Sequence, residues 1–388
     1  MIDADPALVA ELLHRLTAQL AAEGALRSPE WRAAFERTPR HRFVPRFYRR
    51  TSSGRKLVDG ARPERHQEWL AGVYSDDALV TQHDSEDWRI ATSSSTQPSL
   101  MALMLEALDV RDGHSVLEIG AGTGYNAALL CARLGSAAVT TIDIDPGLAQ
   151  TARERLRQLG HTPTVAVADG ARGYPPNAPY DRIIATCAVT HIPPAWIAQT
   201  RPGGIILTNL RGGWGDGLTR IEVLTDGSAV GRFLPDPAAF IAMRGSRPPE
   251  PHQPELFTLT SGQGRGRPIT MLSGIREESF WFLAGLALPH AVRFGSPNTP
   301  SIYDAPRLVD LDDGSWSRID RTPEGGHTVT QGGPRDVWDL LEAAHEQWLT
   351  LGKPARERYG LTVTAAGHTH AWCDSAGSDR TWSLPQPW

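Results

Sequence analysis

The sequence predicts an α/β protein built on a doubly wound, mostly parallel sheet, and three observations carry this prediction. An apolar run at residues 116–119 leads directly into a glycine-rich turn. Further short apolar runs follow at 138–142, 164–168 and 182–187, as expected for successive buried strands. Carboxylates stand directly after two of these runs, at Asp143 and Asp169. Strands that alternate with helices form a parallel sheet, and its ligands bind at the carboxyl ends of the strands.

The first part of the chain, residues 1–85, is predicted to form an N-terminal region of helices and loops. Residues 1–25 have the pattern of an amphipathic helix, expected around 6–22, and a second helix is expected near 29–37. The stretch 46–56 is rich in arginine and is predicted to be a basic loop.

Residues 86–244 are predicted to form the sheet domain. A helix is expected to begin near Tyr125 and to stop at Gly135, and Asp145 with Pro146 opens the next helix. Segments 219–225 and 231–243 are expected to form an antiparallel edge that ends the domain.

The remaining chain divides at its prolines and glycines. Residues 245–274 contain four prolines within ten positions and then a glycine-rich run, so they are predicted to be a linker. Residues 275–388 are predicted to form an α+β domain with a helix at 335–349. This domain holds seven of the twelve tryptophans, which suits either a peptide-binding surface or the core of a small mixed domain.

Composition excludes several classes of protein. No apolar run approaches a membrane span, and acidic residues near the start contradict the basic beginning of a secretion signal, so a cytoplasmic location is expected. A net charge of −5 argues against nucleic acid as the main partner. The three scattered cysteines indicate neither a disulfide framework nor a zinc site. His368 and His370 lack an evident third ligand, so no metal is expected.

The glycine-rich turn has the pattern of a cofactor site. Its glycines stand at Gly120, Gly122 and Gly124, whereas a dinucleotide fingerprint needs its third glycine one place later, at Tyr125. A P-loop would need a lysine after the last glycine. Glu118, two residues before the first glycine, suits a ligand with an amine and hydroxyls. S-adenosyl-L-methionine carries both, so the turn is interpreted as the cofactor turn of a methyltransferase.

Two later carboxylates extend this site. Asp143, 23 residues after Gly120, is predicted to accept hydrogen bonds from the ribose hydroxyls. Asp169 with Gly170 is predicted to meet the adenine amine. Each acid alone could instead be a helix cap. The complete set of predicted cofactor-binding residues is Ser93, Ser94, Glu118, Gly120, Ala121, Gly122, Thr123, Gly124, Asp143, Ile144, Asp169 and Gly170.

A cluster of hydroxyl groups precedes the helix that begins at Pro98. Gln97 is predicted to cap this helix, and residues 93–96 are predicted to be the loop that leads into it. A helix N-terminus offers free backbone N–H groups to an anion, so the segment is predicted to hold a substrate carboxylate. Ser95 and Thr96 are the candidate catalytic residues. The alternative is that the hydroxyls only cap the helix.

Five short motifs in one order carry a family resemblance. Together they resemble protein-L-isoaspartate O-methyltransferase, over roughly residues 39–210. The resemblance implies a class I methyltransferase-type fold and methyl transfer from S-adenosyl-L-methionine to a carboxylate of a peptide. The motifs are Phe-Val-Pro at 43–45, Ser-Ser-Thr-Gln-Pro at 94–98, Asp-Gly-Ala-Arg-Gly-Tyr at 169–174, Ala-Pro-Tyr-Asp at 178–181 and Arg-Pro-Gly-Gly at 201–204.

The segment at Thr96 departs from this family in ways that bear on the substrate. The family places a serine at the position of Thr96, where it touches the carboxylate to be methylated. Threonine keeps the hydroxyl but stiffens χ1 and narrows the pocket. Ser99 and Met101 stand where the repair enzymes often have histidine. These departures count against isoaspartate as the substrate.

The length of the chain suggests a specialised substrate. Family members are usually little more than half as long. Motifs at 314–317, 331–335 and 360–364, with Trp348, resemble the extension of homologues that serve ribosomally made, post-translationally modified peptides such as lanthipeptides, lasso peptides and graspetides. The resemblance therefore implies that an aspartate of a modified, macrocyclic ribosomal peptide is methylated, leading to succinimide (aspartimide) and then isoaspartate.

Three alternatives stay open at this point. The chain could be an isoaspartate repair methyltransferase, a methyltransferase of small molecules, or a non-catalytic peptide-binding protein on the same fold. The set of Glu118, Gly124, Asp143 and Asp169 counts against the last of these. The sequence leaves the oligomeric state open.

Overall fold

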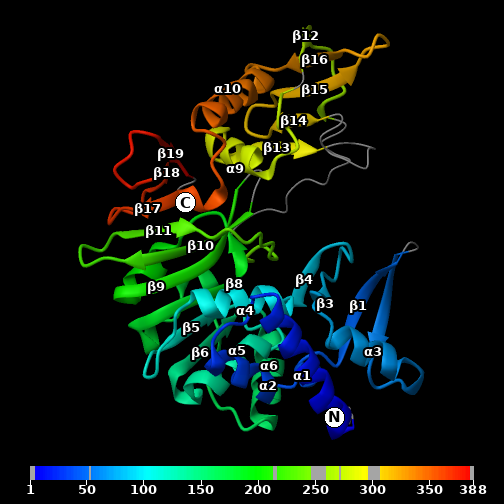
Figure 1. The fold of residues 1–388 in the computed structure, drawn as a ribbon, viewed down its shortest axis with the longest axis vertical. Coiled ribbons are helices and arrows are strands. Elements are labelled where there is room, and N and C mark those ends of the chain that lie inside the picture. Colours follow the sequence, from blue (N-terminus) through cyan, green and yellow to red (C-terminus); the bar gives the residue numbers. More distant parts are fainter. Residues whose placement is uncertain are drawn as a thin grey trace.

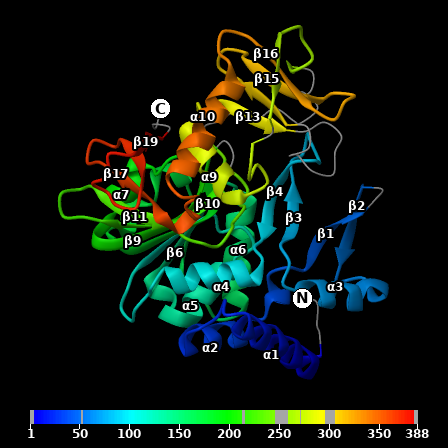
Figure 2. The ribbon, with the colours of Figure 1, turned by 45° about the horizontal axis from the view of Figure 1, so that its top comes forward.

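The computed structural model describes residues 5–51, 54–212, 216–245, 259–270, 272–295 and 306–384. These residues form a four-stranded, a ten-stranded and a five-stranded sheet with helices packed against them (Figures 1 and 2). In this part of the chain no helix is long and apolar enough to cross a membrane. The predicted fold class, α/β with a mostly parallel doubly wound core and a C-terminal α+β region, is confirmed.

The ten-stranded sheet forms the centre of the molecule. Its order is β19-β18-β17-β11-β10-β9-β8-β5-β6-β7. Parallel pairing joins the five strands β9, β8, β5, β6 and β7. These strands are β5 (Val116–Ile119), β6 (Val139–Asp143), β7 (Thr164–Val167), β8 (Tyr180–Val189) and β9 (Thr200–Arg211).

The other half of this sheet is antiparallel and includes the last strands that the structure describes. Its strands are β10 (Asp216–Val223), β11 (Ala229–Phe233), β17 (Tyr359–Val363), β18 (Thr369–Cys373) and β19 (Thr381–Ser383). The predicted antiparallel pairing is confirmed between β10 and β11. Their predicted position at the edge of the sheet is wrong, because β17 pairs with β11 and continues the sheet. The last three strands of the predicted domain 275–388 thus lie in the central sheet.

Both faces of the central strands are buried, which explains their continuous apolar runs. Val116, Ile184 and Leu207 belong to a core shared with the N-terminal helices, α4 and α5. Their neighbours Leu117, Ile183 and Ile206 belong to a second core, shared with α9 and α10. The helices beside the strands are α4 (Pro98–Ala107), α5 (Tyr125–Leu134), α6 (Pro146–Gln158), α7 (Pro194–Ala198), α9 (Glu278–Ala287) and α10 (Val337–Thr350).

The N-terminal helices have the predicted bounds. They are α1 (Pro6–Ala22) and α2 (Pro29–Arg37), and each begins with its proline. The Asp5 side chain caps α1 by accepting a hydrogen bond from the Ala7 N–H at 3.0 Å. Short 3₁₀ helices lie elsewhere along the chain: η1 (Arg40–Arg42), η2 (Pro63–Arg65), η3 (Ser136–Ala138), η4 (Gly170–Arg172), η5 (Pro175–Asn177) and η6 (Arg356–Arg358).

The stretch predicted as a basic loop is a β-hairpin instead. It pairs β1 (Arg46–Thr51) with β2 (Gly54–Asp59) in a sheet of order β2-β1-β3-β4. Phe47 and Val58 face each other in this pairing and are both buried. The neighbouring pair of Tyr48 and Leu57 is more exposed, and most of the remaining pairs are charged, so the sequence shows little alternation. The remaining elements of this region are α3 (His66–Val73), β3 (Leu79–His83) and β4 (Ala91–Ser95).

The five-stranded sheet lies beyond α9 and α10, at the top of Figure 1. Its order is β12-β16-β15-β14-β13, and its neighbours pair antiparallel. Residues 246–258 of the predicted linker lie outside the described residues, whereas 265–269 form β12 of this sheet. Its strands are β12 (Arg265–Ile269), β13 (Val292–Gly295), β14 (Arg307–Asp310), β15 (Trp316–Arg321) and β16 (His327–Gly332).

Candidate active site

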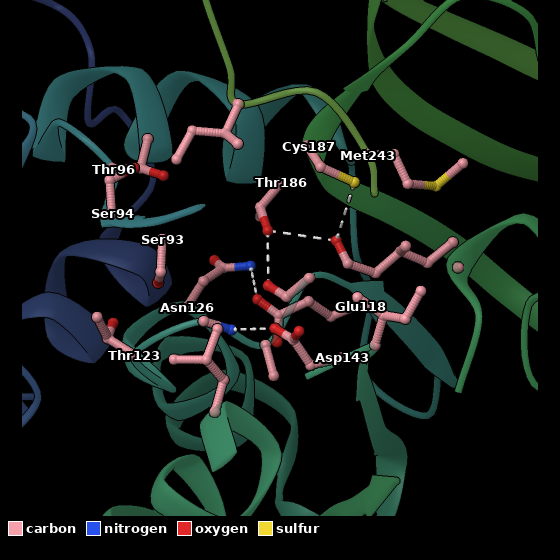
Figure 3. Close-up of a pocket in the computed structure, with 18 of the residues that line it drawn as sticks. Ser93, Ser94, Thr96, Glu118, Thr123, Asn126, Asp143, Thr186, Cys187 and Met243 are labelled. Atoms are coloured by element: carbon pink, nitrogen blue, oxygen red, sulfur yellow. Dashed lines mark hydrogen bonds between the residues drawn. The ribbon is translucent and has the colours of Figure 1, made fainter. Parts of the chain in front are cut away.

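A pocket lies at the carboxyl ends of β5, β6 and β8, where the fold predicts a ligand site (Figure 3). Two of the predicted site residues, Gly124 and Asp169, lie outside its lining. All the others contribute to it. They are Ser93, Ser94, Ser95, Thr96, Glu118, Gly120, Ala121, Gly122, Thr123, Asp143, Ile144 and Gly170.

The glycine turn needs its glycines for conformation and for space. Gly120, Gly122 and Gly124 have φ angles of 96°, 51° and 88°, which favour glycine. A Cβ atom on Gly120 would lie 2.8 Å from the Thr186 hydroxyl oxygen, and one on Gly124 would lie 3.2 Å from the Cα of Ala152 in α6. Gly124 therefore lets α6 pack closely against the turn. The turn itself leaves an open cradle for a ligand.

Asp143 is ordered by the backbone around it. Its carboxylate accepts hydrogen bonds from the N–H of Gly122 at 2.9 Å and from the N–H of Asp145 at 3.0 Å. The guanidinium of Arg244 bridges the carboxylates of Asp143 and Asp145, with a different nitrogen 3.6 Å from an oxygen of each. This buried and oriented acceptor, beside the open glycine turn, fits an adenosyl ligand. The hydrogen bonds between Asp143 and the ribose hydroxyls stay a prediction.

Glu118 lies beneath the turn and is fully buried. Its two oxygens accept hydrogen bonds from Asn126 Nδ2 at 2.7 Å and from the Thr141 hydroxyl at 2.6 Å. Burial raises the pKa of this carboxyl to about 7. Both oxygens already have partners in the protein, so its predicted contact with the ligand amine stays a prediction.

Asp169 is a helix cap in the structure, which was the alternative to its predicted contact with the cofactor. It caps η4 by accepting a hydrogen bond from the Ala171 N–H at 3.0 Å. Asp145 likewise caps α6, as predicted, by accepting from the N–H groups of Gly147 at 2.8 Å and Leu148 at 3.2 Å. The contact of Asp169 with adenine stays a prediction.

The hydroxyl segment is not the predicted loop. Residues 91–95 form β4, which pairs with β3 through Leu79 opposite Ser95 and Val80 opposite Ser94. Ser93 and Ser95 are buried. Serine and threonine give no apolar alternation, so the pattern of the sequence did not reveal this strand.

The N-terminus of α4 has the predicted cap position but is not free for an anion. Gln97 is the cap residue and Pro98 the first helical residue. However, the Asp76 carboxylate accepts hydrogen bonds from the Ser99 N–H at 2.7 Å and from Gln97 Nε2 at 3.1 Å. The predicted carboxylate site at this helix end is therefore filled by Asp76 itself. The Thr96 hydroxyl remains as the candidate group for binding a substrate carboxylate.

Arg40, which was not among the predicted site residues, binds the backbone of residues 95–96. Its guanidinium donates to the carbonyls of Ser95 at 3.3 Å and Thr96 at 3.0 Å, and to the Ser95 hydroxyl at 3.2 Å. Burial lowers the pKa of this fully buried group to about 10, so it stays charged at neutral pH. Ser95 is thus tied to Arg40, which favours a supporting role over the predicted catalytic one.

Several lining residues come from segments that the sequence predicts as strands but does not connect with the site. Thr186 donates to the Gly120 carbonyl at 2.7 Å, and burial raises the pKa of the neighbouring Cys187 thiol to about 12. The segment 241–244 crosses the pocket, held by hydrogen bonds of 2.9 and 2.8 Å between Ala188 and its neighbours Ile241 and Met243. In the sequence, this segment is indicated by the apolar run at 240–243.

A wider cleft adjoins the pocket. Ser94, Thr96 and Ile241 line both cavities. In Figure 3, Ser94 and Thr96 lie on the β4 side of the pocket, away from Asp143. Thr96 therefore lies where the cofactor pocket opens toward the C-terminal region. A group held at this junction can meet a ligand in the pocket while the rest of its molecule lies in the cleft.

Comparisons with known proteins agree on one family. The family model described as "Protein-L-isoaspartate(D-aspartate) O-methyltransferase (PCMT)" matches residues 63–238. A protein-L-isoaspartate O-methyltransferase of Ignicoccus hospitalis is 36% identical over 199 residues, which cover 51% of this chain and 81% of that protein. One of Methanosarcina mazei is 34% identical over 191 residues, covering 49% and 66% respectively.

A solved structure extends the likeness in fold to most of the chain. It is described as a protein-L-isoaspartate O-methyltransferase, and it superimposes with a TM-score of 0.55 and 22% identity. The match covers 94% of this chain and 100% of that one. At this identity the match shows the fold alone. The fold of the C-terminal region is therefore not peculiar to this chain.

Proposed function

Since the chain belongs to the protein-L-isoaspartate O-methyltransferase family and is an S-adenosyl-L-methionine-dependent carboxyl O-methyltransferase, we propose that it methylates a carboxylate of a peptide that enters through the cleft beside Thr96. One observation carries this proposal: Ser94 and Thr96 line both the cofactor pocket and the cleft. A carboxylate at Thr96 is thus placed between the two cavities. The activity is proposed to operate in the cytoplasm.

The residues of the pocket would hold the cofactor by its adenosyl half. The glycine turn and Asp143 form the cradle for that half, and Thr123, Ile144 and Gly170 complete its walls. When bound, S-adenosyl-L-methionine supplies an electrophilic methyl group. The role of the protein is to align the acceptor with this group and to exclude water.

The acceptor needs no general base. A peptide carboxylate has a pKa near 4 and is ionised at neutral pH, so its oxygen can attack directly. The Thr96 hydroxyl is proposed to donate a hydrogen bond to the second carboxylate oxygen and thereby fix the attacking one. Arg40 fixes the backbone that carries this hydroxyl.

The finer proposal is that the acceptor is an aspartate of a modified, macrocyclic ribosomal peptide. Its support is the resemblance of the C-terminal motifs and the cleft beside the site. After methylation, the next backbone amide nitrogen would attack the ester carbonyl and methanol would leave, giving a succinimide. Water then opens the ring, largely to isoaspartate, and this stage needs no further residue.

A second candidate substrate is an isoaspartyl residue of a damaged protein. It is favoured by the printed names of the relatives, all of which describe isoaspartate as the acceptor. The solved structure also weakens the argument from chain length, because it matches most of this chain. Both candidates share the same site and the same methyl transfer.

Mass spectrometry with one enzyme stock separates the two candidates. The substrates are an isoaspartyl hexapeptide, a macrocyclic peptide that contains aspartate, and the linear form of that peptide. Gain of one methyl group by any of them supports carboxyl methylation. Preference for the macrocycle over its linear form, followed by loss of methanol, would support the biosynthetic role, because a macrocycle meets the site preorganised. Best turnover of the isoaspartyl hexapeptide would establish the repair role instead.

A further inference from the structure

The cleft beside Thr96 has one wall from the methyltransferase core and one from the C-terminal region. Its volume is about 900 Å³, near the upper end of about 300–1,000 Å³ that is usual for ligand pockets, so it has room for several peptide residues. The core contributes Leu100 and Phe240. The opposite wall contains Trp281 and Phe282 of α9 and Phe294 of β13.

The charges on these walls balance. Arg211 lies 3.5 Å from the carboxylate of Asp216, and Arg356 pairs with Glu278. The four side chains give two cations and two anions, so the cleft has no strong preference for an acidic or a basic ligand. The remaining lining is largely apolar, and in it Phe294 and Leu100 are half-buried, whereas Trp281, Phe282 and Phe240 are buried behind them.

The aromatic wall is fixed in place before a ligand arrives. The rings of Trp281 and Phe294 are in contact, with centroids 4.2 Å apart. Trp281 Nε1 donates to the Ile275 carbonyl at 2.6 Å, and the Arg356 guanidinium lies over the Phe282 ring at 5.3 Å from its centroid. A rigid aromatic surface loses little entropy when it binds an apolar side chain.

We propose that this cleft binds the peptide segment that flanks the methyl-accepting residue, and that Phe294, which packs on the buried Trp281, selects an aromatic or branched apolar side chain in that segment. The inference rests on the proposed function and adds the substrate class. Thr96 and Ile241 line both cavities, so a peptide whose acceptor carboxylate lies at Thr96 is expected to extend into the cleft.

A peptide series tests the inference. Isoaspartyl heptapeptides and cyclic aspartyl heptapeptides carry glycine at every flanking position or phenylalanine at one of them. In one register phenylalanine is expected to lower KM about tenfold or more, the usual effect of a well-packed apolar contact. Trp281→Leu should reduce this ratio to less than about threefold. Leu340→Ala, on the exposed side of α10, is the matched control and should keep the wild-type ratio.

Two further measurements keep the outcome decisive. Phe294→Leu repeats the test where Trp281→Leu fails to fold, as judged by a cofactor-dependent thermal shift. Calorimetry with the same peptides, made with asparagine in place of the acceptor, measures flank binding without methyl transfer. Equal affinity for glycine and phenylalanine flanks, or a preference that survives both substitutions, would overturn the cleft assignment. Flank-selective binding without any methylation would overturn the proposed function and leave the cleft assignment standing.

Discussion

The cofactor pocket and the adjoining cleft are built in different ways. The floor of the pocket comes from residues 116–145, where backbone N–H groups of Gly122 and Asp145 orient Asp143. The cleft joins residues as far apart in sequence as Ala78 and Arg356, and its polar contacts are made by long side chains, to other side chains or to backbone carbonyls of distant segments. We therefore expect local backbone geometry to determine which cofactor binds in the pocket, and long-range packing of the C-terminal region to determine which substrate reaches it.

Thr96 lies where the two cavities meet, so its substitution should have the largest effect. Thr96→Val keeps the shape but removes the hydroxyl, and methyl transfer should fall by about 100-fold or more, because a misplaced acceptor affects the rate more than ground-state binding. Single-turnover kinetics with the best peptide substrate measure this loss.

Two controls separate loss of the Thr96 hydroxyl from loss of folding or of cofactor binding. Thr96→Ser restores a hydroxyl and should stay active, and calorimetry should show that Thr96→Val still binds the cofactor. Near-normal turnover by Thr96→Val would assign this residue a purely structural role.

Asp143 tests the pocket alone. Asp143→Ala removes a charge-assisted acceptor and should weaken binding of S-adenosyl-L-methionine by about 1.5–3 kcal/mol, or roughly 10- to 100-fold. Calorimetry on the folded variant measures it. Asp226→Ala, which removes a carboxylate from an exposed turn, is the control. Unchanged cofactor affinity in Asp143→Ala would place the ribose contact elsewhere.

The pocket could be predicted from the sequence because its signals are local. Positive φ angles at Gly120, Gly122 and Gly124 favour glycine, and the position of Asp143 at the end of β6 follows from strand and turn geometry. The caps at Asp5 and Asp145 have the same local origin.

The parts that could not be predicted depend on partners distant in sequence. The Ser99 N–H is capped by Asp76, 23 residues earlier, and Arg40 reaches Thr96 across 56 residues. Strand β17 joins β11 across more than 120 residues. A sequence pattern records which residues favour burial or a turn, but it does not record which distant segment completes the structure.

Arg40 supports Thr96, where the pocket and the cleft meet, although it lines neither cavity. Its guanidinium makes six hydrogen bonds, to the carbonyls of Val73, Ser75, Asp77, Ser95 and Thr96 and to the Ser95 hydroxyl. Lysine has three donors and cannot reach all these acceptors.

The substitution Arg40→Lys should therefore lower the free energy of unfolding by about 1–3 kcal/mol, because buried carbonyls lose their donors. Methyl transfer should also fall, but less than in Thr96→Val. Urea unfolding with a parallel rate measurement checks both. Arg37→Lys, whose guanidinium makes one exposed hydrogen bond to Ala132, is the control. Equal stability of the two variants would remove Arg40 from its positioning role.

The last prediction concerns the stability contributed by Glu118 beneath the pocket, which depends on pH. Burial raises the pKa of this carboxyl from 4.5 to about 7, so between these values the folded chain keeps a proton that the unfolded chain has lost. Stability from this group is fully present below the unfolded pKa and is lost as the pH rises through the folded pKa. Glutamine does not titrate. Glu118→Gln should therefore gain stability relative to the wild type between about pH 5 and about pH 8, measured by urea midpoints at both values. Glu346→Gln on the exposed face of α10 should show no such gain, and a Glu118→Gln variant that follows the wild type at both pH values would contradict the raised pKa.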